Sequence, residues 1–283
     1  MKGLLLLEGG AYRGIFTSGV LDAFLENDIM FDTVVGISAG ALCGYNYVSK
    51  NLGRSRDIVF EYGQDKRYFG IGNLVKTGSA FGSKFVFEDL PKSLKFDFDT
   101  FENGANFYVG ATNCRTGECE YFSKNDTDVN FVDCITASAS MPLVSKMVPI
   151  RNDLYLDGGI SEHVPLGFID YDKFDFVVVV LTRPINYQKT RLPKGQAKLY
   201  KFKYRKYPPL LDKLLHEAEI FNKQRQDLIK LNEDDRMIVI EPDERFLVHR
   251  VERDTKKIKD GYHLGYEAGL KYVDLIKERL CQE

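Results

Sequence analysis

The segment Gly36-Ile-Ser-Ala-Gly40 presents a serine in the pattern expected of a nucleophile. In a GxSxG turn the serine lies on a strained bend between a strand and a helix, and the flanking glycines let strand, helix and substrate approach closely. Taken alone, the pattern also fits a glycine-rich turn with a capping serine. We interpret Ser38 as the candidate nucleophile and Gly36 and Gly40 as its flanking glycines.

A loop of small residues between Glu8 and Gly14 follows the first apolar run and opens the first predicted helix. Backbone N–H groups in such a loop can face an anion, and a tetrahedral oxyanion needs about two such donors held in place. A nucleotide loop is disfavoured because GxxxxGKS and GxxxxGKT are absent and Ala11 breaks the GxGxxG spacing, whereas a merely structural turn is an open alternative. The candidate oxyanion-loop residues are Gly9, Gly10, Ala11, Arg13 and Gly14.

An Asp-Gly-Gly turn begins at Asp157, after the apolar and polar alternation of residues 153–156. A carboxylate at the end of a strand can point at a neighbouring site, although such turns are commonplace. A serine hydroxyl is a weak nucleophile at neutral pH and needs a base within hydrogen-bond reach. We therefore predict Asp157 as the base, with Gly158 and Gly159 completing the turn.

The elements that must position these motifs alternate along the chain, which predicts an α/β fold with a mostly parallel central sheet and helices on both faces. Strands are expected at 3–7, from Thr33, at 174–181 and at 236–241, and helices at 14–27, 39–49 and 262–279. Segments 106–112 and 118–122 flank a turn at Gly117, which predicts an inserted β-hairpin. We expect a single domain over residues 1–283, with a motif-bearing core at about 3–182 and a C-terminal elaboration at about 183–283.

Together the three motifs resemble the patatin-like phospholipase family from about residue 3 to residue 165, and residues 137–142 (ASASMP) resemble its small-residue segment before a proline. The resemblance implies a three-layer sandwich and a Ser-Asp dyad without a catalytic histidine, in which loop 9–14 is the oxyanion hole, Ser38 attacks and Asp157 accepts its proton. The chain departs from the pattern at Glu8, Ala11 and His163, where the family favours Asp, Gly and Asn. Because alanine adopts positive φ only at a cost, Ala11 is expected in an ordinary backbone region.

A Ser-Asp-His triad is the alternative mechanism, because α/β-hydrolases carry those residues in that chain order. His216 and His249 stand in charged surroundings typical of solvated residues. His263 precedes the predicted closing helix, where it could complete a triad.

The composition excludes several classes of function. Hydrophobic residues make up 44% and charged residues 28% of the 283, as in a globular protein, and the net charge of −2 excludes a globally basic protein held to nucleic acid by charge. The apolar run at residues 4–7 is too short for a membrane span or a signal peptide, which predicts a cytoplasmic protein. The five cysteines form no CxxC motif and no ligand cluster, so free thiols and neither a metal site nor a cofactor are expected.

Residues 187–207 combine eight basic side chains with five aromatic ones and contain no Asp or Glu. Such a segment suits the headgroup region of an anionic membrane, where each basic residue contributes about 1 kcal/mol. It also resembles a platform for single-stranded nucleic acid or a solvated loop. The esterase motifs favour peripheral membrane contact, and no specific nucleic acid is expected.

Six phenylalanines are concentrated in residues 81–101, between the serine motif and the predicted hairpin. They predict either an acyl-chain pocket or its lid, or ordinary core packing. They are Phe81, Phe85, Phe87, Phe96, Phe98 and Phe101.

The sequence thus predicts a serine acyl-ester hydrolase, of the phospholipase A or carboxylesterase type, that acts on phospholipids or other lipid esters through an acyl-enzyme on Ser38. Two alternatives keep the same fold: a catalytically quiet lipid-binding or regulatory module, and an acyltransferase that uses the same dyad. A nucleic-acid-binding role through residues 187–207 is a third, weaker option.

Overall fold

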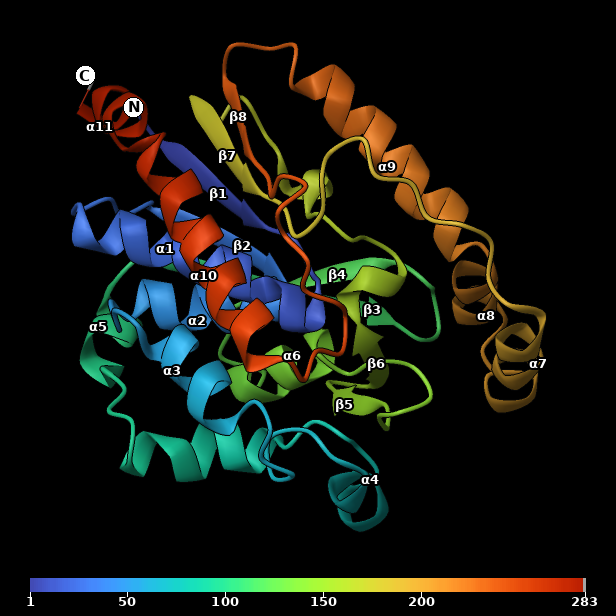
Figure 1. Ribbon diagram of the computed structural model, residues 1–283. Helices are drawn as coiled ribbons and strands as arrows, with labels where there is room; N and C mark the ends of the chain where they lie inside the picture. The colour runs from blue at the N-terminus through green and yellow to red at the C-terminus, as the bar shows by residue number, and fades with distance from the viewer. Residues whose placement is uncertain (282–283) are drawn as a thin grey trace.

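An eight-stranded sheet runs through the middle of the molecule (Figure 1). The computed structural model describes residues 1–281. The strands follow the order β5-β6-β3-β2-β1-β7-β8, and β4 pairs with β3 over residues 108–112. Their bounds are β1 Gly3–Leu7, β2 Thr33–Ile37, β3 Asn106–Asn113, β4 Cys119–Ser123, β5 Val148–Ile150, β6 Asp153–Asp157, β7 Phe176–Val180 and β8 Met237–Ile240.

Strands β1, β2, β3, β7 and β8 pair in parallel, whereas the pairs β3–β4, β3–β6 and β5–β6 are antiparallel. Every residue of β1, β2 and β7 is buried, which explains their nearly continuous apolar sequences. The prediction of a mostly parallel sheet is confirmed.

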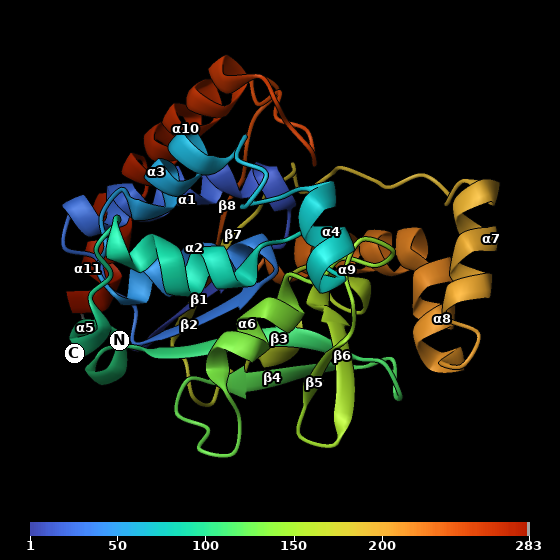
Figure 2. The same ribbon diagram turned by 90° about the horizontal axis from the view of Figure 1, so that it is seen from below.

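Helices cover both faces of the sheet (Figures 1 and 2). The alternation along β1 shows the two cores: Leu5 and Leu7 pack with the α1 and α2 side, whereas Leu4 and Leu6 pack with the side that carries Leu228 of α9. Helix α10 lies outside α1, and α7 and α8 project at one end of the sandwich (Figure 2). The helices are α1 Gly14–Glu26, α2 Ala39–Val48, α3 Arg54–Tyr62, α4 Ile71–Thr77, α5 Phe98–Asn103, α6 Phe131–Ser138, α7 Lys194–Lys203, α8 Pro208–Leu215, α9 Glu217–Leu231, α10 Thr255–Leu270 and α11 Val273–Cys281.

The predicted hairpin is confirmed as β3 and β4, with Gly117 at φ 75° in the turn. The prediction of a single closing helix at 262–279 is wrong, because the chain forms two helices there, α10 and α11. Helix α10 begins at Thr255, seven residues before the predicted start, because Asp254 caps it by accepting from the N–H groups of Lys256 and Lys257. The break after Leu270 lets Val273 and Ile276 of α11 join the main core.

Among residues 1–281, no helix is both long enough and apolar enough to cross a bilayer. The five cysteines are free thiols, three of them buried.

Candidate active site

Ser38 lies between β2 and α2 in a strained backbone conformation, with φ 54° and ψ −117°. A residue with a Cβ atom pays about 1–3 kcal/mol for such a conformation, so the surroundings must impose it. They do so by close approach: a Cβ atom on Gly40 would lie 2.3 Å from the carbonyl oxygen of Leu7, and one on Gly36 would lie 2.6 Å from that of Gly40. The turn therefore requires glycine at both positions, Gly40 against the end of β1 and Gly36 against the start of α2.

The side chain of Ser38 meets that of Asp157, 119 residues further along the chain. Ser38 Oγ donates to Asp157 Oδ2 at 2.8 Å, and both residues are buried. Asp157 is the last residue of β6, and its other carboxylate oxygen accepts from the N–H of Gly159 at 2.8 Å. Both carboxylate oxygens are thus fixed, with one of them on the serine hydroxyl.

Burial raises the pKa of the Asp157 carboxyl, although the hydrogen bonds from Ser38 and from the N–H of Gly159 act in the opposite direction. A carboxylate with a raised pKa is a better match for accepting a proton near neutral pH than an ordinary one. The pair is therefore arranged for removal of the serine proton.

Loop 9–14 leaves two backbone donors free beside Ser38. Gly9 uses both of its backbone groups, since its N–H donates to His163 O and its carbonyl accepts from Thr182 Oγ1. The N–H groups of Arg13 and Gly14 donate within the loop. Among the described residues the N–H groups of Gly10 and Ala11 have no acceptor, and both residues line a cavity with Ser38.

The expectation for Ala11 is wrong, because its φ is 51°. The chain must turn from β1 into a short 3₁₀ turn at Ala11–Arg13 while Gly10 packs against Thr182. This geometry requires a left-handed residue at position 11, and alanine carries the penalty of roughly 1–2 kcal/mol.

Glu8 anchors the base of the loop. Its carboxylate is buried, accepts from the N–H of Thr182 at 2.6 Å and pairs with Arg225 Nη2 of α9 at 2.7 Å. Because both partners of this ion pair are buried, removing one would leave an uncompensated charge in the interior. The glutamate that departs from the family pattern thus fixes the loop to β7 and α9.

Ser138 has a supporting role that the sequence did not reveal. Its hydroxyl accepts from the N–H of Ser38 at 2.9 Å and donates to Gly110 O at 2.6 Å. Ser138 therefore holds the Ser38 backbone against β3. Its position in the small-residue segment 137–142 was the available signal.

The histidines do not assemble the alternative triad. His216, His249 and His263 are exposed. His163 lies in the site, yet its Nε2 faces Lys189 Nζ at 3.1 Å, and no hydrogen bond within residues 1–281 joins it to Ser38 or Asp157. Burial and the charges of Lys189 and Arg250 hold its pKa well below the usual value, so this imidazole is neutral at neutral pH.

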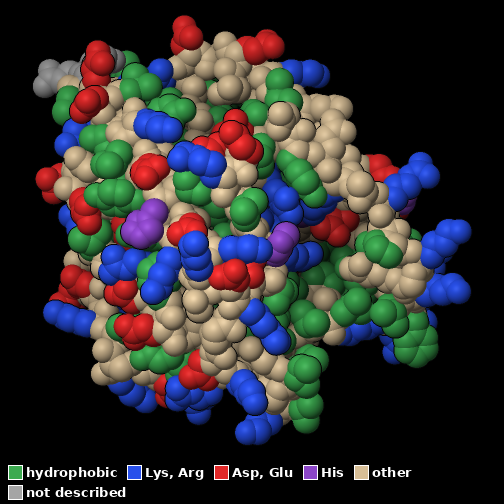
Figure 3. Space-filling model, viewed as in Figure 1, with side chains coloured by type: hydrophobic (Ala, Val, Ile, Leu, Met, Phe, Trp, Pro, Cys, Tyr) green, Lys and Arg blue, Asp and Glu red, His purple; other side chains and the backbone are tan. Residues whose placement is uncertain are grey.

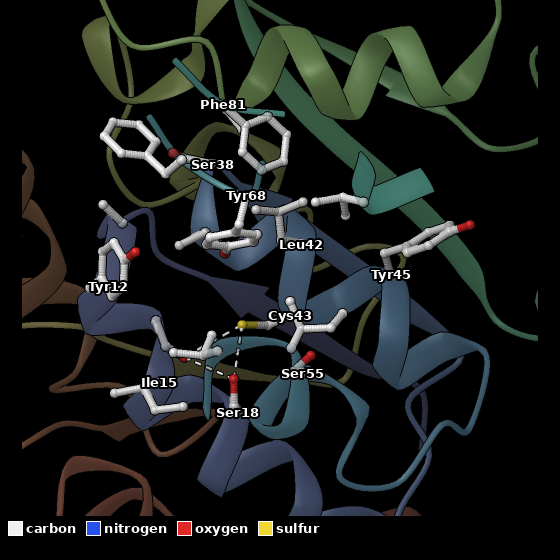
Figure 4. A pocket seen from close by; sticks show the side chains of 18 of the residues that line it. Tyr12, Ile15, Ser18, Ser38, Leu42, Cys43, Tyr45, Ser55, Tyr68 and Phe81 are labelled. Atoms are coloured by element: carbon white, nitrogen blue, oxygen red, sulfur yellow. Dashed lines mark hydrogen bonds between the residues drawn. The ribbon is translucent and has the colours of Figure 1, made fainter. Parts of the chain in front are cut away.

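Two cavities meet at Ser38. The apolar pocket, of about 100 Å³, is formed mainly by α1, α2, α3 and the segment 68–87 (Figure 4). The polar chamber, of about 230 Å³, opens on Ser38 and Asp157. Its charged and imidazole-bearing walls are Arg13, His163, Arg183, Lys189, Glu217 and Arg250.

The phenylalanines divide between the two predicted roles. Phe81 and Phe87 line the apolar pocket, and Figure 4 shows Phe81 close to Ser38. Phe85 and Phe96 are buried outside its lining, and Phe98 is exposed. The pocket is thus walled by part of the aromatic stretch, together with residues of α1 and α2. In the part of the chain described, no cluster of three or more His, Cys, Asp or Glu side chains could hold a metal ion.

Comparison with known proteins gives a consistent result. A family model described as patatin-like phospholipase matches residues 5–169, and one described as a domain of unknown function (DUF6363) matches residues 207–281. The uncharacterized protein YjjU of Escherichia coli (strain K12) is 31% identical over 188 residues, 64% of this chain and 52% of that protein. The probable lipid hydrolase 463L of Invertebrate iridescent virus 6 is 24% identical over 202 residues, 63% of this chain and 69% of that protein.

Among solved structures, VipD from Legionella pneumophila matches with a TM-score of 0.56 and 16% identity, covering 97% of this chain and 67% of that chain. This likeness concerns the fold alone and agrees with the predicted α/β sandwich. The chain spans about half the length of the Escherichia coli relative.

The raised pKa of Asp157 predicts that this residue opposes folding at neutral pH. A carboxyl whose pKa is higher in the folded state stabilises the fold below its unfolded pKa, and that stability is lost as pH rises through the folded pKa. We expect Asp157→Asn to raise the free energy of unfolding at pH 7, with the difference vanishing at about pH 3, below the unfolded pKa of an aspartate. Denaturant titration at both pH values measures it.

The matched control is Asp153→Asn at the other end of β6, where the guanidinium of Arg115 lowers the pKa of the carboxyl to about 2. That substitution should change stability at pH 7 in the opposite direction. An Asp157→Asn protein less stable than wild type at pH 7 would contradict the assignment of a destabilised carboxylate.

Proposed function

Because the chain belongs to the patatin-like phospholipase family, we propose that it hydrolyses acyl esters of lipids, with Ser38 as nucleophile and Asp157 as general base. The observation that carries this proposal is the 2.8 Å hydrogen bond from Ser38 Oγ to Asp157 Oδ2. The name of the viral relative, a probable lipid hydrolase, points to the same reaction class.

The reaction proceeds in two halves. Ser38 Oγ bonds to the ester carbonyl carbon while its proton moves to Asp157, and the N–H groups of Gly10 and Ala11 donate to the oxyanion. Collapse of the tetrahedral intermediate releases the alcohol, which takes the proton from Asp157. A water molecule then attacks the acyl-enzyme, gives a proton to Asp157, and the carboxylic acid leaves as the proton returns to Ser38.

The apolar pocket is the proposed site of the acyl chain. Its walls at Ile15, Leu42, Tyr68 and Phe81 are apolar or aromatic, and it opens on Ser38. Burial of a chain there contributes about 0.8 kcal/mol for each CH₂ group. The ester carbonyl then lies at Ser38, between this pocket and the polar chamber.

We also propose that α7 contacts an anionic membrane surface. Its Leu199 and Phe202 are 56% and 73% exposed, and Figure 3 shows apolar and basic side chains together at that edge. Seven of the eight basic residues of segment 187–207 are exposed, which gives the charge complementarity. The expectation is wrong for Lys189, which lines the polar chamber, and for Tyr200 and Tyr204, which are buried.

Hydrolysis of p-nitrophenyl acyl esters tests the reaction. Ser38→Ala and Asp157→Asn should each lower kcat by at least about 10³-fold, because each removes one half of the nucleophile and base pair. His263→Ala is the matched control, since His263 is exposed and outside both cavities. A wild-type protein that binds lipid without any turnover would contradict the proposal and favour a binding module.

The chain-length profile tests the acyl pocket. Leu42→Trp should fill space beside Ser38 and lower the ratio of kcat/KM for dodecanoyl over butanoyl esters by roughly tenfold. Leu270→Trp adds the same side chain on the exposed side of α10 and should leave the ratio unchanged. Equal ratios in both variants would show that the acyl chain binds outside this pocket.

Vesicle cosedimentation tests the membrane contact. Phe202→Asp should reduce binding to vesicles of phosphatidylglycerol and phosphatidylcholine by roughly tenfold or more, because it removes an apolar anchor and adds a negative charge. Ile229→Asp, on an exposed position of α9, is the control. Wild-type binding that is equal for neutral and anionic vesicles would argue against a charge-assisted contact.

A further inference from the structure

The polar chamber holds more positive than negative charge. Four cationic side chains line it, and they come from three segments of the chain: Arg13, the pair Arg183 and Lys189 after β7, and Arg250. The carboxylates in its lining are Asp157 and Glu217. The walls therefore carry a formal excess of two positive charges, in a chain whose net charge is −2.

Three of these cations lack the carboxylate partners that several arginines elsewhere in the chain have. Lys189 Nζ pairs with Glu217 Oε1 at 2.6 Å. Within residues 1–281, no carboxylate lies within 4.0 Å of the guanidinium groups of Arg13, Arg183 or Arg250. Arg115, Arg151, Arg236 and Arg245, by contrast, each lie within 2.8 Å of an aspartate.

Arg13 is the most constrained of the three. Its Nε is buried and has no hydrogen-bond partner. Burial and the neighbouring charges of Arg183 and Arg250 lower the pKa of its guanidinium to about 10, although the charge of Glu8 acts in the opposite direction. Because it stays protonated at neutral pH, the cluster keeps a mutual repulsion that an anion would relieve.

The chamber opens on the reacting atoms. Ser38 lies in the lining of both cavities, and the free N–H groups of Gly10 and Ala11 belong to residues that line the chamber. An ester has two arms at its carbonyl carbon. With the acyl arm in the apolar pocket, the alcohol arm occupies the chamber, so the anion that fits there is part of the alcohol.

On these grounds, and resting on the proposed function, we propose that the chamber binds a phosphate monoester on the alcohol part of the substrate, through Arg13, Arg183 and Arg250. The substrate class is then an acylglycerol phosphate, and hydrolysis releases a glycerol phosphate. A phosphate monoester carries a charge of about −1.5 to −2 at pH 7, close to the excess in the walls. Guanidinium groups bind phosphate oxygens in pairs, which suits a cluster of arginines.

The same charges disfavour other headgroups. A choline group on the phosphate would bring another cation among the arginines, and the one wall carboxylate outside the catalytic pair, Glu217, is already held by Lys189. A neutral acylglycerol would leave the arginines without an anion. The chamber therefore favours the bare phosphate over both.

Calorimetric titration of the Ser38→Ala protein with glycerol 3-phosphate tests the site without relying on turnover. We expect binding, with affinity lowered roughly ten- to a hundred-fold by a second substitution, Arg183→Gln. The control carries Arg245→Gln as its second substitution. Arg245 is an exposed arginine outside the chamber, so the change of charge is the same and the affinity should stay unchanged. Absence of binding, or equal loss in both double variants, would overturn the proposal.

Two further ligands identify the source of the phosphate. Glycerol should not bind, and inorganic phosphate should bind more weakly than glycerol 3-phosphate because it lacks contacts beyond the arginines. Equal affinity for inorganic phosphate and glycerol 3-phosphate would assign the chamber to free phosphate and overturn the headgroup assignment.

Hydrolysis in detergent micelles then links the site to selectivity. The wild-type kcat/KM for a monoacylglycerol phosphate should exceed those for the matching monoacylglycerol and its phosphocholine ester by roughly tenfold or more, and Arg183→Gln should remove most of this preference. Hydrolysis of all three at equal rates would overturn the headgroup inference and leave the esterase standing. Glycerol 3-phosphate binding without hydrolysis of any ester would overturn the esterase and leave the phosphate site.

Discussion

The close approach of β1, β2 and α2 at the serine turn is the constraint on which the site depends. Gly40 leaves no room for a side chain against the end of β1, and Gly36 leaves none against the start of α2. Ser38 adopts its positive-φ conformation within this close approach. Ser138 holds the backbone N–H, so the hydroxyl is left to point at Asp157. The strain is local, and the buried strands on either side support it.

The sheet order explains how distant segments meet there. The proposed oxyanion loop follows β1, Ser38 follows β2, Thr182 follows β7 and Asp157 ends β6, so that each group proposed for the chemistry stands where a strand ends. The segment after β7 supplies a different contribution. The walls of the chamber beside Ser38 and Asp157 include Arg183, Lys189, Glu217 and Arg250. In the proposed reaction, the N-terminal part of the chain thus supplies the reacting groups and the C-terminal part shapes the site for the alcohol.

The motifs and the parallel sheet could be predicted because short patterns encode them locally. A glycine–serine–glycine bend, an Asp-Gly-Gly turn and continuous β-branched runs each have a direct structural consequence. The positive φ of Ala11 could not be predicted, because it follows from the packing of Gly10 on Thr182, which is 172 residues away in sequence. The position of Lys189 could not be predicted for a related reason. The sequence around it is basic and typical of an exposed segment, and only the contacts of its Nζ with Glu217 and His163 place this lysine in the chamber wall.

Chemical trapping of the nucleophile tests the central claim most directly. A fluorophosphonate with a long alkyl chain should phosphonylate the wild-type protein once, with loss of fluoride, and peptide mass spectrometry should find the adduct on Ser38. The Asp157→Asn protein should react far more slowly because its serine has no base. An adduct on another residue, or equal rates in the two proteins, would contradict the Ser38–Asp157 account.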